Sequence, residues 1–495
     1  MLAKYGPESI GIVAGPLLSL EEATTVERFA REAISTTCWS IALEPQDRMI
    51  AERTSKKANS VLPEQLAECD CVFLVGDLFS QYPVVSRGVL SARYAKRGNR
   101  VITVDPRSCA TIQFSDEWVK VAPAGEWAAL AYLLKQAIRL TGGGGTKWER
   151  ISDEALLSIS GTSRQLLEGI LEELLRATNL AVWVSSESAG ELAQRLGSTL
   201  ASVLSSKARE LLIYESGNGL GVFQVARRGM FIEDFLRLVA RRKFRALFAF
   251  GYDLFSEYPS ESLKRGLNEV EFLVAGDMYM TETGKVATVF FPLASWLEAE
   301  GSYLSLDGRI INLEPVLPPP GDGQPLRRLL ELIARRLGRQ IEIPEAPAIS
   351  EEKAEKENLE SELMLLEKAV YEAVESQPRV SRVSKEYPYV MEMCRDPLHT
   401  GNGLISRNSR FAKGPAWVEM SYLDFRNLGL SKEGFVKVTS EFGEGVFLAR
   451  PNKGLPKGMV AACKAYPEVR GLLGRYASLT GEKGTPWDRV AVERW

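Results

Sequence analysis

The sequence predicts an α/β protein with two Rossmann-like halves followed by a compact β-rich domain. The heptapeptide DLFSQYP (Asp77–Pro83) returns as DLFSEYP (Asp253–Pro259), 176 residues later. Each copy comes after a short apolar segment that contains a terminal glycine, and after Pro378 short glycine-bounded segments replace the helical patterns. The spacing is far longer than the roughly 20–50 residues of a solenoid repeat. We therefore interpret the heptapeptides as two copies of one supersecondary unit.

Strands alternate with helices through the first half. A capping box at Ser19–Glu22 predicts the start of a helix, and a basic helix is expected over about 84–97. The apolar runs are typical of strands that are covered on both faces. The strands expected here are Ile10–Gly15, Cys71–Gly76, Arg100–Asp105, Leu180–Ser185 and Glu210–Glu215.

The second copy repeats the order of strand, glycine, heptapeptide, helix and strand. Its strands are expected at Ala246–Gly251 and Phe272–Asp277. Such alternation implies parallel sheets, whose ligands bind beyond the carboxyl ends of the strands. Both heptapeptide loops are therefore expected to face a ligand in a shared cleft; the alternative is an old duplication in which the second loop only packs.

The remainder of the chain changes in character twice. A helix is expected to end near Leu337, and a charged amphipathic helix is expected within 350–375, where leucines recur at helical spacing. The last third is predicted to be β-rich, with strands at Gly434–Ser440, Gly445–Arg450 and Gly458–Cys463.

Composition excludes several classes of function. The net charge of −3 gives no argument for nucleic-acid binding, no run of about 18 apolar residues predicts a membrane span, and the first residues do not resemble a signal peptide, so a cytoplasmic protein is expected. The six cysteines have neither zinc nor iron–sulfur spacing. A single histidine, His399, removes most hydrolase and zinc-enzyme mechanisms.

Three stretches carry a resemblance to a known family. They are VFLVGDLFSQYPVV with the later RVITVDPR, the segment Phe272–Ile310, and HTGNG at His399–Gly403 with the strands that follow it. Together they resemble the molybdopterin oxidoreductase superfamily, which contains formate dehydrogenases and the large G-type component of respiratory complex I.

The resemblance implies two Rossmann-like, doubly wound domains related by a pseudo-twofold axis, and a C-terminal six-stranded double-psi β-barrel. It also implies the domain boundaries. These are 1–37 with 236–345 for one Rossmann-like domain, 38–235 for the other, 346–378 for a charged helical linker and 379–495 for the barrel.

Active relatives bind two pterin guanine dinucleotides that hold molybdenum or tungsten. Glycines admit a pyrophosphate to the backbone, strand-end carboxylates accept from a guanine edge, and hydroxyls suit phosphate. The resemblance implies that the cofactor-binding residues are Gly76, Asp105, Arg107, Gly217, Asn218, Gly219, Gly251, Asp277, Thr281, Thr283, Thr400, Gly401 and Asn402.

The sequence departs from active relatives at several positions. Leu-Phe replaces Asn-Pro in both loops, Ser305 replaces an asparagine, and the chain starts beyond the usual iron–sulfur domain, so no cluster is expected in it. The expected metal-ligand region contains Cys38, Ser40 and Ser55 but no histidine, and none of the three is singled out. No protein ligand to a metal is therefore predicted.

Three hypotheses remain. The favoured one is a vestigial subunit, similar to the G-type component of complex I, which scaffolds iron–sulfur and other redox subunits of an electron-transfer complex. The alternative is an active molybdenum or tungsten bis-pterin subunit of the formate or formylmethanofuran dehydrogenase type, in which His399, Arg227 or Arg228 orients a small anionic substrate. A nucleotide-binding sensor fits the two halves but leaves the barrel unexplained.

Overall fold

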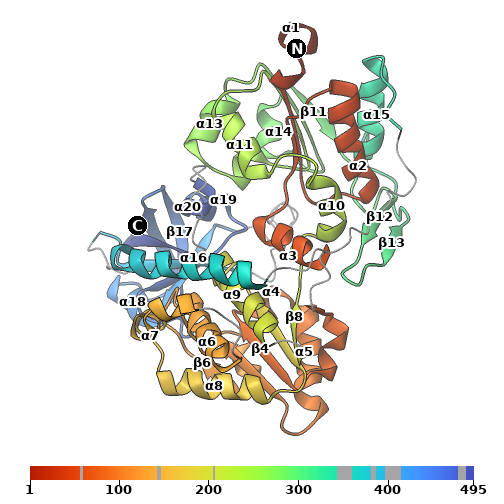
Figure 1. The fold of residues 1–495 in the computed structure, drawn as a ribbon. Helices are drawn as coiled ribbons and strands as arrows, with labels where there is room; N and C mark the ends of the chain where they lie inside the picture. Colours follow the sequence, from red (N-terminus) through yellow and green to blue (C-terminus); the bar gives the residue numbers. More distant parts are fainter. Residues whose placement is uncertain are drawn as a thin grey trace. The chain divides into compact units, whose positions relative to one another are not determined.

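The computed structural model describes residues 1–55, 60–141, 146–204, 207–342, 359–380, 386–395, 414–477 and 487–495. The chain divides into two compact units (Figure 1). Unit 1 comprises residues 1–55, 213–353 and 475–483, and unit 2 comprises 56–212, 354–474 and 484–495. Both contain parallel sheets with helices, and unit 2 also contains a closed β-barrel. The predicted α/β class with a β-rich C-terminal part is confirmed.

Unit 1 is built on a five-stranded sheet in which every pair is parallel. The strands are covered on both faces, which agrees with their continuous apolar sequence. In spatial order they are β11 (Val289–Pro292), β10 (Phe272–Asp277), β9 (Ala246–Phe250), β1 (Ile10–Ala14) and β2 (Trp39–Ile41).

Helices pack on both faces of the unit 1 sheet. Figure 1 shows α2 and α15 together on one face, with α11 and α13 on the other. The capping box predicted at Ser19 forms with both of its hydrogen bonds, so it starts α2 as expected. The α-helices of this unit are α1 (Leu2–Tyr5), α2 (Leu20–Arg28), α3 (Pro45–Ser55), α10 (Gly219–Ala226), α11 (Ile232–Ala240), α12 (Leu254–Glu257), α13 (Glu261–Leu267), α14 (Glu282–Val286) and α15 (Leu326–Arg336).

A separate two-stranded antiparallel sheet, β12 (Gly301–Leu304) and β13 (Ile310–Leu313), also belongs to unit 1.

Unit 2 contains a second all-parallel sheet, of six strands. In spatial order they are β3 (Ser60–Val61), β8 (Ala208–Leu211), β7 (Leu180–Val184), β4 (Cys71–Val75), β5 (Arg100–Val104) and β6 (Glu117–Val119). The strand expected at Glu210–Glu215 begins earlier and ends at Leu211, because the chain after Ile213 joins unit 1.

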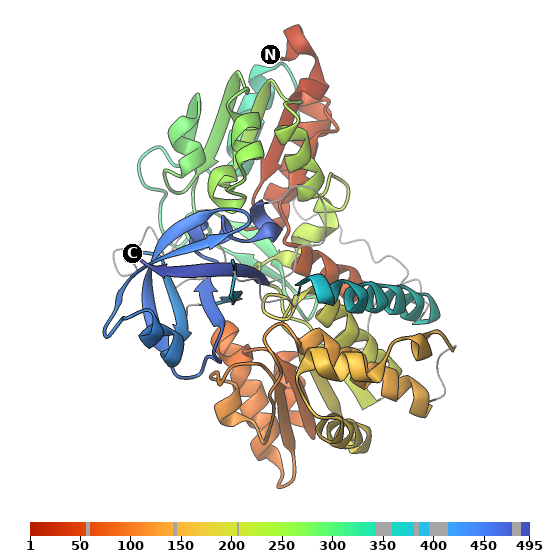
Figure 2. The same cartoon turned by 90° about the vertical axis from the view of Figure 1, so that its left-hand side faces the viewer.

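One face of this sheet packs on a large apolar cluster to which α6, α8, α9 and α16 contribute. The predicted charged helix is observed over its described part as α16, whose Leu363, Leu366 and Val370 are buried in that cluster. α16, the cyan helix in Figure 2, packs against α9 and α7. The helices are α4 (Leu78–Gln81), α5 (Pro83–Ala95), α6 (Glu126–Thr141), α7 (Asp153–Ser160), α8 (Arg164–Arg176), α9 (Gly190–Val203) and α16 (Leu359–Val380).

The C-terminal strands form a closed barrel, seen in blue in Figure 2. Two pairs, β14 with β18 and β15 with β17, are parallel, and the others are antiparallel. Around the barrel the strands are β14 (Tyr389–Cys394), β18 (Met459–Cys463), β15 (Trp417–Ser421), β17 (Glu444–Asn452), β16 (Gly434–Ser440) and β19 (Trp487–Arg494). Short helices α18 (Tyr422–Asn427), α19 (Pro467–Arg470) and α20 (Gly474–Ala477) connect this region.

Apart from β3 at the edge of the unit 2 sheet, the two parallel sheets have equivalent orders of strands, but the chain enters them at different points. In unit 2, β4, β5 and β6 run to one side and β7 and β8 to the other; in unit 1, β9, β10 and β11 correspond to the first group and β1 and β2 to the second. One sheet is therefore a circular permutation of the other. This relation accounts for a heptapeptide that follows β4 in one unit and β9 in the other.

Candidate functional site

Each heptapeptide lies at the switch point of its own sheet. β4 stands between β5 and β7, and β9 stands between β10 and β1. In open α/β sheets the loops at such a point, at the carboxyl ends of the strands, form the usual ligand crevice. Gly76 (φ 102°) and Gly251 (φ 58°) both end these strands with left-handed backbone, which favours glycine.

In unit 2 the heptapeptide is tied down by a threonine from the loop after β5. Asp77 Oδ1 accepts hydrogen bonds from the Thr111 hydroxyl at 2.7 Å, the Thr111 amide at 3.2 Å and the Ser80 amide at 3.3 Å. The Thr111 hydroxyl in turn accepts from the Phe79 amide at 3.0 Å. The aspartate therefore caps α4 and joins two loops.

Unit 1 contains the same tie. The Thr283 hydroxyl donates to Asp253 Oδ1 at 2.7 Å and accepts from the Phe255 amide at 3.4 Å. The Thr283 amide also donates to Asp253 Oδ1 at 3.0 Å, and the Ser256 hydroxyl donates to Oδ2 at 2.6 Å. An extra residue, Tyr252, separates the glycine from the aspartate only in this copy.

The two strand-end aspartates occupy equivalent positions and differ in surroundings. Asp105 follows β5 and binds Arg107 through the Arg107 amide at 2.7 Å, Nε at 3.0 Å and Nη2 at 3.1 Å, which engages both carboxylate oxygens. Asp277 ends β10 and accepts only at Oδ1, from the amides of Met278 at 2.7 Å and Tyr279 at 3.4 Å, among the described residues. Burial raises the pKa of Asp277 to about 7.

The glycine-rich segment after β8 is packed within unit 1. Asn218 is buried, its amide nitrogen donates to the Leu18 carbonyl at 2.8 Å, and its Oδ1 accepts from the Leu304 amide at 2.7 Å. A Cβ at Gly219 would lie 2.7 Å from the Tyr214 ring, so close packing requires this glycine. At Gly217 a Cβ would meet no atom within 4 Å.

The remaining predicted residues are dispersed. Thr281 caps α14 by accepting from the Gly284 amide at 3.0 Å. Arg228 pairs with Glu27 at 3.0 Å, and Arg227 is the C-terminal cap of α10. His399, Thr400, Gly401 and Asn402 lie outside the described residues.

The thiol of Cys38 is held inside unit 1. It is buried and lies 3.1 Å from Glu8 Oε2, and burial together with this carboxylate raises its pKa to about 11. A metal ligand must be a thiolate, so this environment opposes ligation. Across the described ranges no group of three or more His, Cys, Asp or Glu side chains is placed to hold a metal ion.

A buried charged cluster joins the unit 2 sheet to the barrel. Glu392 of β14 lies 3.5 Å from Arg107 Nη2, and Glu126, at the start of α6, is buried beside the same group. Burial raises the pKa of Glu392 to about 8, and burial with the nearby Glu392 and Asp105 raises that of Glu126. One guanidinium therefore lies among three carboxyl groups, and burial favours the protonated form of the two glutamates.

A second buried ion cluster covers the carboxyl end of β7. Glu187 accepts from Arg395 Nε at 2.6 Å, and Lys464 Nζ lies 3.7 Å away. Arg395 and Lys464 directly follow the parallel barrel strands β14 and β18, and the Arg395 guanidinium lies 5.0 Å from the centre of the Tyr82 ring of the heptapeptide. The barrel ends are thus fixed to the loops at the switch point.

Sequence reasoning named Thr283, as a cofactor-binding residue, but missed its bond to the heptapeptide and missed Thr111. Thr111 follows its aspartate by 34 positions and Thr283 follows its own by 30, so extending the comparison of the two copies beyond seven residues would have found this pair. Glu126, Glu187 and Glu392 gave no signal, because a buried glutamate is not distinguishable from an exposed one in a single sequence.

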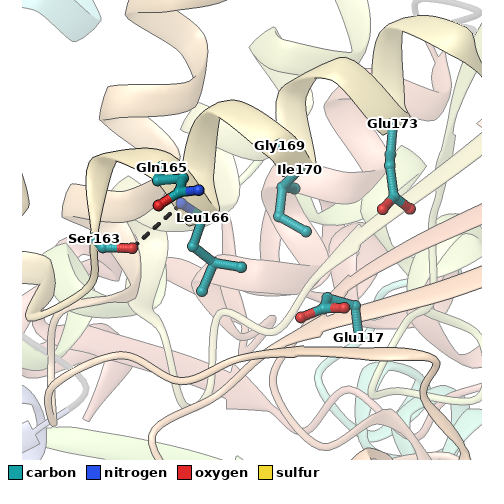
Figure 3. A pocket seen from close by; sticks show the side chains of 7 residues that line it. All are labelled: Glu117, Ser163, Gln165, Leu166, Gly169, Ile170 and Glu173. Carbon is teal, nitrogen blue, oxygen red and sulfur yellow. Dashed lines mark hydrogen bonds between the residues drawn. The ribbon is translucent and has the colours of Figure 1, made fainter.

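A surface pocket lies on the side of the unit 2 sheet where the strands begin, away from the switch-point loops (Figure 3). It is formed by one side of α8, from Ser163 to Glu173, and by Glu117 at the start of β6. The Arg100 guanidinium bridges the two glutamates, at 3.1 Å from Glu173 and 3.8 Å from Glu117. Since it adjoins the amino ends of the strands, this pocket is separate from the switch-point loops.

No helix in the described part of the chain combines the length and apolarity needed to cross a bilayer.

Comparisons with known proteins agree with this architecture. Residues 186–334 match the family model of molybdopterin oxidoreductases. The alpha subunit of F420-dependent formate dehydrogenase 1 from Methanococcus maripaludis is 20% identical over 93% of this chain and 82% of its own. The G 2 subunit of NADH-quinone oxidoreductase from Rhizobium meliloti is 22% identical over 94% of this chain and 60% of its own. Acetylene hydratase from Pelobacter acetylenicus has a similar fold, with a TM-score of 0.73 at 14% identity over 100% of this chain and 87% of its own.

Proposed function

Because this chain carries a molybdopterin oxidoreductase domain, as its sequence predicted, we propose that it is a subunit of a multisubunit redox complex that keeps the family fold without the family's catalytic site. In this proposal it scaffolds iron–sulfur and other redox subunits. Relatives in formate dehydrogenases and NADH-quinone oxidoreductases, themselves named as subunits, support the assignment to a complex.

One observation carries the proposal: four of the polar side chains expected to bind the dinucleotides already form hydrogen bonds within the chain. Asn218 is engaged through both its amide atoms, the Thr283 hydroxyl binds Asp253, and Asp105 is bound by Arg107 through both its oxygens. Thr281 caps a helix. Releasing these bonds would leave buried donors and acceptors without partners, which costs about 1–3 kcal/mol for each group.

These residues therefore do not fit the cofactor as they stand. A phosphate or guanine would have to displace intrachain partners that are already in place. The buried Arg395–Glu187 pair, which covers the carboxyl end of β7, adds to this obstacle. The finer fold assignment, two Rossmann-like domains related by a pseudo-twofold and a double-psi barrel, is part of the proposal and is supported by the permuted sheets and the two identical Asp–Thr ties.

Asp277 favours the alternative, an active molybdenum or tungsten subunit of the formate or formylmethanofuran dehydrogenase type. Its Oδ2 accepts no hydrogen bond from the described residues, and it lies at the carboxyl end of a strand beside the switch point. A guanine edge offers donors that such an oxygen accepts.

Metal and pterin analysis of the purified complex separates the two candidates. The scaffold proposal predicts neither molybdenum nor tungsten and no extractable pterin in proportion to this chain. One metal per chain with pterin would refute it. In that event Asp277→Asn should lower the pterin content, whereas Asp307→Asn, in an exposed turn with Arg309, should not.

The same preparation tests the remaining hypothesis. A chain that purifies without partners and binds free guanine nucleotide is a nucleotide sensor, and that result would overturn both redox interpretations. A cytoplasmic location stays part of the proposal and is tested by fractionation of the source cells.

A further inference from the structure

The outward face of α15 carries a row of arginines. Arg328, Leu332, Arg335 and Arg336 occur at positions i, i+4, i+7 and i+8 and therefore share one face of the helix. Arg339 follows just beyond the helix end, and all five side chains are exposed. We call these five residues the basic stripe. The opposite face of α15 is buried in the apolar core of unit 1, where the helix packs beside α2 (Figure 1).

The four arginines of the basic stripe form no ion pair with any residue in the described ranges. Other arginines of unit 1 behave differently: Arg327, one residue away, pairs with Glu300, Arg242 pairs with Glu269 at 3.4 Å, and Arg309 pairs with Asp307. The stripe is also not a consequence of a basic chain, because the net charge is −3. Positive charge is thus concentrated on one helix face, where four arginines stand against one acidic side chain, Glu331.

Helix stability explains only part of this row. Arg335 and Arg336 occupy the last turn, where the helix dipole favours cations. Arg328 lies in the first turn, where the same dipole opposes a cation. Leu332 stands between them with 47% of its surface exposed, and Leu337 beyond them has 45% exposed. A helix face that only contacts water gains no stability from a cation in the first turn or from exposed leucines.

The chemistry of the stripe fits an acidic protein surface. Every cation between residues 326 and 340 is an arginine, and protein interfaces are enriched in arginine and depleted in lysine. The guanidinium fork binds carboxylates through two parallel hydrogen bonds. The exposed Leu332 and Leu337 offer an apolar contact that a protein surface can make and a phosphate backbone cannot. The negative net charge of the chain also works against a nucleic-acid polyanion.

We infer that the basic stripe of α15 docks an acidic surface of a partner protein within the redox complex, an inference that rests on the proposed function. The partner surface should present aspartates or glutamates around an apolar side chain that covers Leu332.

Zero-length crosslinking tests the contact directly. Full-length Arg328→Lys/Arg335→Lys keeps the charge and introduces amines that carbodiimide joins to carboxylates in contact. The complex purified with this variant should give crosslinks from α15 to Asp or Glu of a partner. The matched control, Arg87→Lys/Arg97→Lys, changes two exposed and unpaired arginines of unit 2 and should give none. An intact complex without partner crosslinks from α15 overturns the inference.

Charge reversal provides the second measurement. Arg328→Glu/Arg335→Glu should weaken partner binding about tenfold or more and make the complex dissociate at lower salt, while Arg87→Glu/Arg97→Glu leaves it unchanged. Circular dichroism of both variants confirms that they fold. Unchanged affinity, or loss of the contact on nuclease digestion, overturns the acidic-protein inference and leaves the proposed function standing. If the wild-type chain forms no complex, both this inference and the proposed function are refuted.

Discussion

Replacing Thr283 by valine removes the hydroxyl that joins the second heptapeptide to the loop after β10, without changing the side-chain shape. The hydroxyl donates to Asp253 Oδ1 at 2.7 Å and accepts from the Phe255 amide at 3.4 Å. Thr283 and Asp253 are 1% and 3% exposed, so water does not replace the missing group.

The expected loss follows from these contacts. A hydrogen bond to a charged group contributes about 1.5–3 kcal/mol, and a buried donor that is left without a hydrogen-bond partner costs about 1–3 kcal/mol. Because the hydrogen bond from the Phe255 amide is long, its loss adds a cost of about 1 kcal/mol, the lower end of the range for a buried donor. Thr283→Val should therefore lower the free energy of unfolding by about 2–4 kcal/mol. Thr111→Val makes the same change in unit 2, where Asp77 is only partly buried and water substitutes, so a smaller loss of about 1–3 kcal/mol is expected.

Urea unfolding followed by circular dichroism gives the free energies, and hydrogen exchange of the peptides around Phe255 and Thr283 locates the effect. Thr439→Val is the control: its side chain forms no hydrogen bond within the described chain and is half-buried on β16, so a change within about 0.5 kcal/mol is expected. If Thr283→Val matches this control and leaves exchange unchanged, the Asp–Thr tie does not hold the loop.

Three further predictions address charge and packing. Burial raises the pKa of Asp277 to about 7, so the folded chain keeps a proton that the unfolded chain releases at about pH 4. The stability that this proton contributes is present below about pH 4 and is lost as the pH rises to about 7. Asp277→Asn should therefore remove up to about 4 kcal/mol of the decline in unfolding free energy that urea titrations measure between pH 4 and 8. Arg107→Met should cost about 3–5 kcal/mol at pH 8, where a part of Glu392 is ionised, and less at pH 5, where Glu392 is protonated; equal losses at both values would contradict the charged cluster. Gly15→Ala places a Cβ 2.0 Å from the Gly251 carbonyl oxygen and should lower the free energy of unfolding by about 1–3 kcal/mol. Gly169→Ala lies in a helix, where the added Cβ meets no atom within 4 Å, and should raise it by about 0.5–1 kcal/mol. Melting temperatures that shift in the same direction would refute the packing argument.

The α/β class was predictable because its signals are local. Apolar runs such as Cys71–Val75 and Phe272–Asp277 are strands in both prediction and structure, and the Ser19 capping box marks a helix start through two short-range hydrogen bonds. The family resemblance was confirmed by a match that includes one of the stretches that carried it, the segment that begins at Phe272.

The permuted order of the two sheets was not predictable. β2 (Trp39–Ile41) joins the sheet of unit 1, and this pairing with β1 depends on contacts that no local pattern encodes. The domain boundaries stay a prediction, as does the shared cleft between the two heptapeptide loops. Buried charged residues such as Glu392 could not be predicted either, because their partners lie far away in the sequence.

The repeated heptapeptide has a structural explanation that needs no ligand. In both units its aspartate binds a threonine of the neighbouring loop and a serine of the following turn, through the Ser80 amide in unit 2 and the Ser256 hydroxyl in unit 1, so the motif fixes two loops at the switch point of each sheet. Conserving this role after duplication requires the aspartate and its backbone geometry, which are nearly equal in the two copies (φ −92°, ψ 78° at Asp77 and φ −90°, ψ 88° at Asp253). Recognition of a cofactor must then depend on residues the copies do not share. Asp105, bound by Arg107, and Asp277, with one oxygen unpartnered within the described chain, are the pair in which the two halves differ. If this protein binds any nucleotide, the half that contains Asp277 is where binding is expected.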